Sequence, residues 1–84
     1  MHVIVEHEIS DPAAFFSIGP PPAGIEGRQM LPSRDRTAAV CLFEADSVDA
    51  VRDWLEPLTR GVSVNTYFEA DSEFALGLPV AAAL

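Results

Sequence analysis

His7 has more chemistry open to it than any other side chain in this sequence. It stands between the carboxylates Glu6 and Glu8 in the segment HVIVEHEI, residues 2–9. Imidazole together with carboxylates suits zinc, nickel or manganese, and His2 is the only other imidazole in the chain. An imidazole also serves as a general base or a hydrogen-bond partner beside a ligand, because its charge state is easily tuned. The elements that carry His7 decide between these roles.

A divalent-cation site is the first prediction. Residues 37–45 are expected to form a strand parallel to the one over 2–9, so that their C-terminal ends lie together. Glu44 then joins His7 and Glu8 as candidate metal ligands, and the same end collects further acids: Glu6, Asp11, Asp46 and Asp49. In a simpler interpretation the aspartates cap helices and the glutamates are solvated. No H-x-x-x-H or C-x-x-C spacing favours the metal.

A ligand-binding face is the second prediction. Alternation along residues 2–9 places His7 on the same side as Val3 and Val5. If that side points into the cavity of a barrel, Asn65 and Tyr67, which share a face of the neighbouring last strand, supply further polar contacts beside His7. The simpler interpretation leaves His7 half-exposed at the strand end and bonded to a glutamate.

The remaining reactive side chains favour structural roles. Cys41 lies in the middle of an apolar run without the cationic neighbour or helix N-terminus that a catalytic thiolate needs. The arginines at 28, 34 and 36 have the forked geometry to bind an anion. Local pairing with the more numerous acids is the simpler account. Catalytic residues and any cofactor therefore stay unassigned.

Composition narrows the classes of partner. The 84 residues are 49% hydrophobic and carry a net charge of −8, with five basic residues, all arginine, against thirteen acids. Nucleic acid and anionic membranes require a basic surface, so neither is expected as a partner. A single cysteine requires no oxidising compartment, and no apolar run is long enough to span a membrane. We expect a cytoplasmic protein, and the arginine-only basic set is typical of GC-rich bacterial genomes.

Hydrophobic periodicity predicts six elements in one domain over residues 1–84. Strands are expected over 2–9, 24–31, 37–45 and 62–69, the second as a glycine-weakened edge strand or a bulge. A helix of about two turns begins at Pro12 and ends at Gly19. A second begins after an Asp46 cap and ends at Pro57. Residues 71–79 hold at most one capped turn, and residues 78–84 form a short apolar tail.

This order, β-α-β-β-α-β, predicts an α+β fold of the ferredoxin-like type. Right-handed crossovers place both helices on one face of a four-stranded antiparallel sheet, with the first and third strands in the centre. The third strand is apolar on both sides, yet the helices cover only one. A bare apolar sheet face predicts a homodimer that closes into an α+β barrel.

The segments VEHEISDPAAFF, AAVCLFEADSVDAVRDWL and SVNTYFEAD resemble small uncharacterised bacterial proteins of the dimeric α+β-barrel superfamily. That superfamily includes antibiotic-biosynthesis monooxygenases, haem-degrading enzymes, stress-responsive barrel proteins and small metal-binding relatives. The resemblance implies the fold and the dimer. It implies no active residue, because its members share a fold and not one chemistry.

Three functions follow as hypotheses. The first is a non-catalytic homodimer that binds a small ligand or a divalent metal. The second is a small oxygenase or isomerase that works without a tightly held cofactor and uses a cavity histidine and tyrosine. The third is a regulatory module that binds another protein, with the tail over 80–84 as part of the contact.

Overall fold

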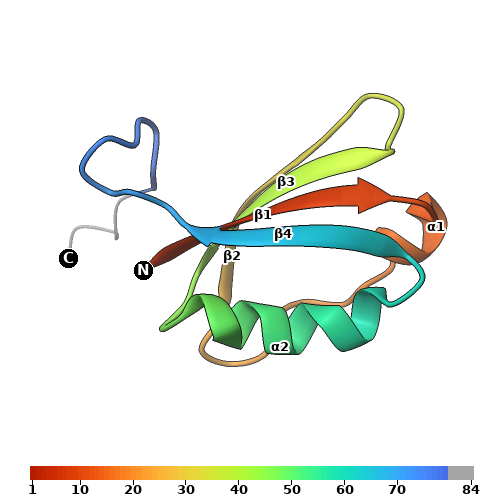
Figure 1. The fold of residues 1–84 in the computed structure, drawn as a ribbon, viewed down its shortest axis with the longest axis horizontal. Helices are drawn as coiled ribbons and strands as arrows, with labels where there is room; N and C mark the ends of the chain where they lie inside the picture. Colours follow the sequence, from red (N-terminus) through yellow and green to blue (C-terminus); the bar gives the residue numbers. More distant parts are fainter. Residues whose placement is uncertain (80–84) are drawn as a thin grey trace.

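The computed structural model describes residues 1–79 as a four-stranded sheet with two helices. The strands are β1 (His2–Ile9), β2 (Glu26–Pro32), β3 (Ala38–Glu44) and β4 (Ser63–Glu69). The helices are α1 (Pro12–Phe15) and α2 (Val48–Thr59), and α2 lies along one face of the sheet (Figure 1). The α+β class and the order of the elements are as the sequence predicts.

The sheet has the order β2-β3-β1-β4, and every neighbouring pair is antiparallel. The central position of β1 and β3 is confirmed, but the expectation that they run parallel is wrong. The crossover through α1 keeps β2 in the direction of β1, and the hairpin from β2 then reverses the chain into β3. His2 therefore lies opposite Glu44, and Glu8 opposite Ala38.

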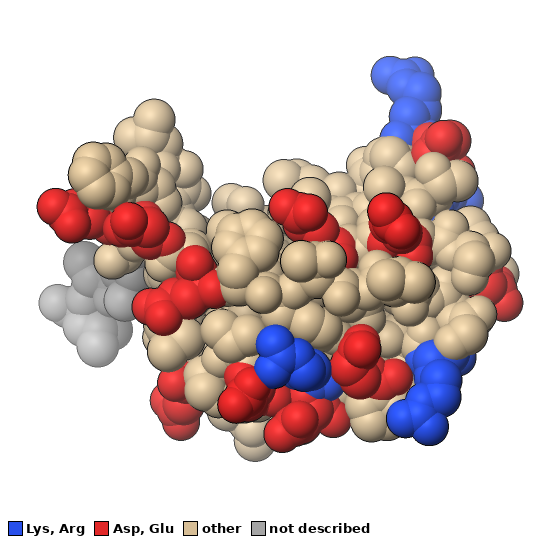
Figure 2. All heavy atoms as spheres, viewed as in Figure 1, with Lys and Arg blue, Asp and Glu red and all other residues tan. Residues whose placement is uncertain are grey.

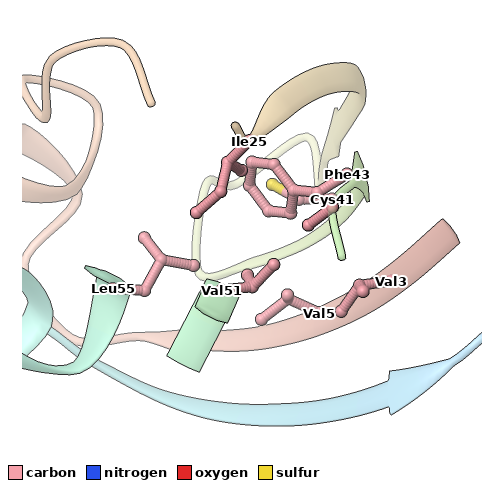
Figure 3. Packing of buried hydrophobic residues seen from close by; sticks show 8 residues of the cluster. Val3, Val5, Ile25, Cys41, Phe43, Val51 and Leu55 are labelled. Carbon is pink, nitrogen blue, oxygen red and sulfur yellow. The ribbon is translucent and has the colours of Figure 1, made fainter. Parts of the chain in front are cut away.

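One face of the sheet and the inner side of α2 form the main core. β1 supplies Val3 and Val5, which are fully buried. They face Val51 and Leu55 of α2 across the core (Figure 3). The other members come from the residue before β2, from β3 and the residue after it, and from α2: Ile25, Cys41, Phe43, Ala45, Val51 and Leu55. A second, smaller cluster forms where α1 meets the sheet around Ile9, Phe15 and Ala39. The two clusters leave His7 between them in the sequence of β1.

The opposite sheet face has no covering element among residues 1–79. It is called the open face below, and its large apolar side chains are exposed by 41–68%: Leu31, Val40, Val64 and Phe68. Glu6 and Glu8 lie among them, because register pairs Glu6 with Val40 and Glu8 with Val64. The third strand is buried on the helix side, but on the open face it is buried only in part, since Leu42 is buried while Val40 is exposed.

The helix boundaries differ from prediction in ways that local chemistry explains. α1 has four residues rather than two turns, and the chain leaves it through Gly19 into the proline segment over 20–22. Ser47, not Asp46, caps α2, since its hydroxyl accepts from the Ala50 N–H at 3.0 Å. The helix also passes Pro57 and ends at Thr59, whose hydroxyl donates to the Leu55 carbonyl at 2.9 Å. Proline so near the end removes only one helical hydrogen bond.

The expected weakness of the second strand is confirmed. β2 is an edge strand, and its pairing with β3 is irregular between Gly27 and Gln29. Every residue of β2 is exposed. The bulge turns Arg28 toward the neighbouring acids.

Residues 71–79 form an arm that leaves the end of β4 and extends beyond the sheet (Figure 1). A turn capped by Asp71, whose carbonyl accepts from Phe74 and Ala75, confirms the expected single turn. Phe74 and Leu76 are 78% and 98% exposed on this arm. The greater part of the predicted apolar tail, residues 80–84, lies outside the described residues.

Acidic side chains are scattered in separate groups over the visible face, with uncharged side chains between them, and the basic side chains are few (Figure 2). No basic stripe of the kind that tracks a phosphate backbone is present on that face. No helix within residues 1–79 is both long enough and apolar enough to cross a membrane.

Candidate functional site: a buried histidine beside an apolar pocket

Sheet register brings the three predicted ligand-binding residues together. β1 and β4 pair so that His7 lies opposite Asn65, and Val5 opposite Tyr67. All three polar side chains project from the helix side of the sheet, not from the open face that would line a face-to-face barrel, and His7 is only 3% exposed. The expected half-exposed histidine bonded to a glutamate is therefore wrong. His7 is buried, and its partner is an amide.

Asn65 is the centre of a polar network. Its Oδ1 lies 2.7 Å from His7 Nδ1 and accepts from the Ser63 hydroxyl at 2.8 Å. Its Nδ2 donates toward Glu56 Oε2 at 2.8 Å, Thr59 Oγ1 at 2.8 Å and the Tyr67 hydroxyl at 3.2 Å. The Tyr67 hydroxyl in turn donates to Glu56 Oε2 at 2.8 Å. One asparagine thus links a strand histidine to a helix carboxylate.

Glu56 and Thr59 are the members of this network that sequence reasoning missed. They stand three positions apart on α2, a spacing that places both on the helix face toward β4. The sequence contained a signal for them. Val51 and Leu55 on the same helix are apolar, whereas Glu56 and Thr59 are polar, and a helix that packs on polar Asn65 and Tyr67 must supply polar partners.

An apolar pocket of about 360 Å³ adjoins the network, with His7 among its lining residues. It lies between the sheet, α2 and the connector from α1 to β2. One turn of α1 and a proline segment cover this part of the sheet less completely than a full helix. The principal apolar lining residues are Phe15, Phe16, Met30, Cys41, Phe43 and Trp54. We call this space the His7 pocket.

Two buried side-chain polar atoms in the described part of the chain have no hydrogen-bond partner, His2 Nε2 and His7 Nε2, and only His7 lines the apolar pocket. The other nitrogen of the His7 ring is bonded to Asn65. Phe15 packs edge-on against the imidazole with ring centroids 4.8 Å apart. An unmade hydrogen bond at a buried polar atom costs about 1–3 kcal/mol, so a donor that reaches Nε2 is favoured.

Burial shifts the protonation of the groups around the pocket. It lowers the pKa of His7, with the Asn65 bond and the Glu56 charge opposing it more weakly. Burial and the bond to Glu56 raise the pKa of Tyr67, while hydrogen bonds from Tyr67 and Asn65 lower the pKa of Glu56. Near neutral pH the network therefore holds a neutral imidazole, a phenol and a carboxylate.

The Cys41 thiol lines the same pocket without the features of a nucleophile. Burial raises its pKa to about 11, so the thiol stays protonated at neutral pH. This agrees with the structural role expected from its position in the middle of a strand.

The predicted metal set is not assembled. His7 lies opposite Ala39, whereas Glu44 is at the far end of β3, opposite His2. Glu8 projects from the open face and His7 from the helix face, since they are adjacent on one strand. The error follows from the parallel direction assumed for β1 and β3. No group of three or more His, Cys, Asp or Glu side chains in the described part of the chain is arranged to hold a metal ion.

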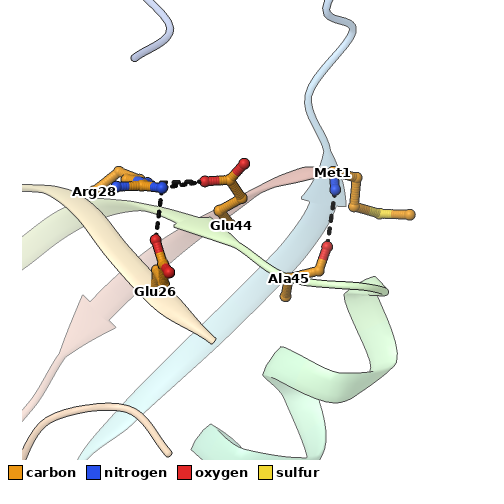
Figure 4. Close-up of polar contacts among 5 residues, drawn as sticks. All are labelled: Met1, Glu26, Arg28, Glu44 and Ala45. Carbon is orange, nitrogen blue, oxygen red and sulfur yellow. Dashed lines mark hydrogen bonds and ion pairs between the residues drawn. The ribbon is translucent and has the colours of Figure 1, made fainter. Parts of the chain in front are cut away.

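Glu44 has a different partner. The Arg28 guanidinium bonds to both Glu44 and Glu26 at the edge of the sheet, close to the Met1 ammonium that donates to the Ala45 carbonyl at 2.9 Å (Figure 4). The Arg28 hydrogen bond lowers the pKa of Glu44. Local pairing of Arg28 with its neighbouring acids is thus observed, as the simpler account predicts.

The arginines of the β2–β3 hairpin lie at one end of the sheet and the acid at the end of β4 lies at the other. Arg34 and Arg36 lie in the β2–β3 hairpin, at the end where Glu8 pairs with Ala38. Glu69 lies at the other end, opposite Val3. The hairpin arginines and Glu69 therefore lie at opposite ends of the sheet.

Comparison with protein-family models, with curated proteins and with solved structures found no match to this chain.

Proposed function

We propose that the protein binds a small, largely apolar molecule in the His7 pocket and does so without catalysis. The observation that carries the proposal is His7 itself: a side chain 3% exposed, anchored on one nitrogen and unpartnered on the other, beside an apolar space. A volume of about 360 Å³ lies within the range of small-molecule sites. Such sites combine apolar walls with few polar groups, as this one does.

Thermal-shift measurements with a panel of aromatic and alicyclic compounds test this proposal. A compound that binds only the folded state raises Tm as its concentration rises. Gly27→Leu fills the pocket, because a Cβ at Gly27 meets Phe43 Cε1 at an ordinary 3.9 Å and the longer side chain extends into the space. Thr66→Leu, at an exposed position on the open face, is the matched control.

The wild type and Thr66→Leu should show the same shifts, and Gly27→Leu should show none. Absence of any shift in the wild type, or equal shifts in Gly27→Leu, contradicts binding in the His7 pocket.

We also propose that the fold is ferredoxin-like and that two copies pair through their open faces as a cytoplasmic homodimeric barrel. The support is the row of exposed apolar side chains on β2, β3 and β4, an area that a soluble monomer rarely leaves bare. The open face is hollowed by a depression of about 640 Å³ around Glu6 and Glu8. In a face-to-face pair that depression gives the carboxylates a hydrated interior.

A second candidate function is a small barrel enzyme in which His7 is the general base. The unpartnered Nε2 favours it, because a neutral buried imidazole can accept a proton from a bound substrate. Enzyme assays on compounds that bind the pocket separate the two candidates: turnover lost in His7→Gln supports the enzyme, and binding without turnover supports the binding protein.

A further inference from the structure

We propose that the His7 pocket selects uncharged ligands that carry an O–H or N–H donor on a ring-sized apolar body, because the surrounding network makes His7 Nε2 a hydrogen-bond acceptor. Phenols are the simplest members of this class. The inference rests on the proposed ligand binding and names its chemistry.

The first step is the orientation of the Asn65 amide. Glu56 is a carboxylate, which only accepts hydrogen bonds. The Thr59 hydroxyl has already given its proton to the Leu55 carbonyl, and the Tyr67 hydroxyl has given its proton to Glu56. None of the three oxygens on this side has a proton left to donate to Asn65, so the end of the amide that faces them is the NH₂, which donates toward them.

The second step is the position of the proton on His7. With its NH₂ turned to α2, Asn65 presents Oδ1 to the imidazole at 2.7 Å. An amide oxygen only accepts, so His7 Nδ1 carries the proton and donates it. In the neutral ring Nε2 then holds a lone pair and no proton. Glu56, Thr59 and Tyr67, which do not line the pocket, thus determine that His7 Nε2 is a hydrogen-bond acceptor there.

The third step is charge. Burial outweighs the Asn65 bond and the Glu56 charge, the groups that act to protonate His7, and the ring stays neutral. Arg28 also lines the pocket, but its guanidinium is paired with Glu26 and Glu44 at the edge of the sheet. An anionic ligand that bonds to Nε2 needs an imidazolium donor, which burial disfavours. A cationic ligand would lose its hydration against aromatic and aliphatic walls without a facing carboxylate. Uncharged donors remain.

The fourth step is access. Nε2 is fully covered in this conformation, and Phe15 packs on the ring from the one-turn helix α1. A ligand therefore reaches Nε2 only when the packing around the imidazole opens, and we infer that Phe15 moves, because it packs on this ring and also lines the pocket. An aromatic ligand replaces the lost edge-to-face contact with one of its own.

Titration of three matched probes into the full-length protein tests the inference, with His7 and Phe15 resonances followed by NMR. Phenol has a donor, anisole has only an acceptor and toluene has neither, on the same ring. One added hydrogen bond to a buried acceptor corresponds to roughly tenfold in affinity. Phenol should bind about tenfold more tightly than anisole and toluene, and benzoate should bind more weakly than phenol.

His7→Leu should remove the preference for phenol while it retains toluene, and Thr66→Ala should leave both unchanged. The comparison of probes on the wild type stands even where His7→Leu fails to fold. If anisole or toluene equals phenol, or benzoate exceeds it, the donor inference is overturned and pocket binding stands. If no probe perturbs the His7 or Phe15 resonances, binding in the pocket is itself contradicted.

Discussion

At the scale of single residues, His7 is buried among apolar neighbours yet keeps one nitrogen free. A buried histidine usually has both nitrogens satisfied, since an unpaired polar atom is costly. Here Asn65 satisfies Nδ1, and the protein bears the cost at Nε2. An unsatisfied buried group of this kind requires an explanation, and a bound ligand that donates to Nε2 supplies one.

The buried imidazole makes stability depend on pH. Burial lowers the folded-state pKa of His7 below its usual 6.5, so the unfolded chain binds the proton more readily. The contribution of His7 to the free energy of unfolding is therefore complete above about pH 6.5 and is lost as the pH falls toward the folded-state pKa. Urea unfolding between pH 7.5 and 5.5 should show a steeper loss for wild type than for His7→Gln. Parallel profiles would show that His7 is not buried in its neutral form.

Asn65→Ala tests the network at its centre. The substitution leaves His7 Nδ1 and Glu56 without their shared partner, and we expect a loss of about 2 kcal/mol in the free energy of unfolding. Thr66→Ala on the opposite face of β4 should cost about 0.5 kcal/mol. Chemical denaturation measures both, and equal losses would mean that the Asn65 bonds add nothing beyond strand propensity.

At the scale of elements, α2 contributes the carboxylate that orients the network, and it must begin in the right place to do so. The Ser47 hydroxyl caps its first turn, while Asp46 is exposed. Ser47→Ala should therefore cost about 1 kcal/mol, whereas Asp46→Ala should change stability by less than about 0.5 kcal/mol. Thermal unfolding of the pair measures the difference. A larger loss of stability for Asp46→Ala than for Ser47→Ala would show that Asp46 is the N-cap, as the sequence predicted.

Sequence periodicity predicted the elements well because each strand has a distinct pattern. The alternation along β1 and β4 put His7 on one side and placed Asn65 with Tyr67, and both assignments are confirmed. Periodicity does not indicate the direction of a strand, however. Because β1 and β3 were predicted to be parallel, Glu44 was predicted at the wrong end of the sheet. The helix ends were equally beyond reach: adjacent Asp46 and Ser47 are both good caps, and only the chain geometry chooses between them.

The pocket could not be predicted for a different reason. It exists because α1 stops after one turn and the chain then crosses the sheet as an extended connector. A longer helix, as predicted from Pro12 to Gly19, would cover the same surface. A space left by a missing element has no pattern in the sequence.

At the scale of the whole molecule, the open face decides whether the protein works alone. Its apolar side chains favour a second copy, while Glu6 and Glu8 oppose close approach of two identical faces. A dimer therefore needs the depression around these carboxylates to stay hydrated. Otherwise two like charges would lie close together in a medium of low dielectric constant.

Sedimentation velocity tests the assembly. The wild type should sediment as a dimer at micromolar concentration, Val64→Glu on the open face should be monomeric, and Glu6→Gln should associate several-fold more tightly because it removes a repelling pair. Leu58→Glu, at an exposed apolar position of α2, is the control and should stay dimeric. A wild type that remains monomeric at high concentration would contradict pairing through this face.

The most direct test of the account is the protonation of His7 in the intact protein. Long-range ¹H–¹⁵N correlation spectra at pH 7 distinguish the two neutral tautomers and the imidazolium. We expect a neutral His7 with its proton on Nδ1, and an Nε2 resonance that shifts when phenol is added. A proton on Nε2, or a cationic ring at pH 7, would contradict it, because the pocket would then offer a donor in place of an acceptor.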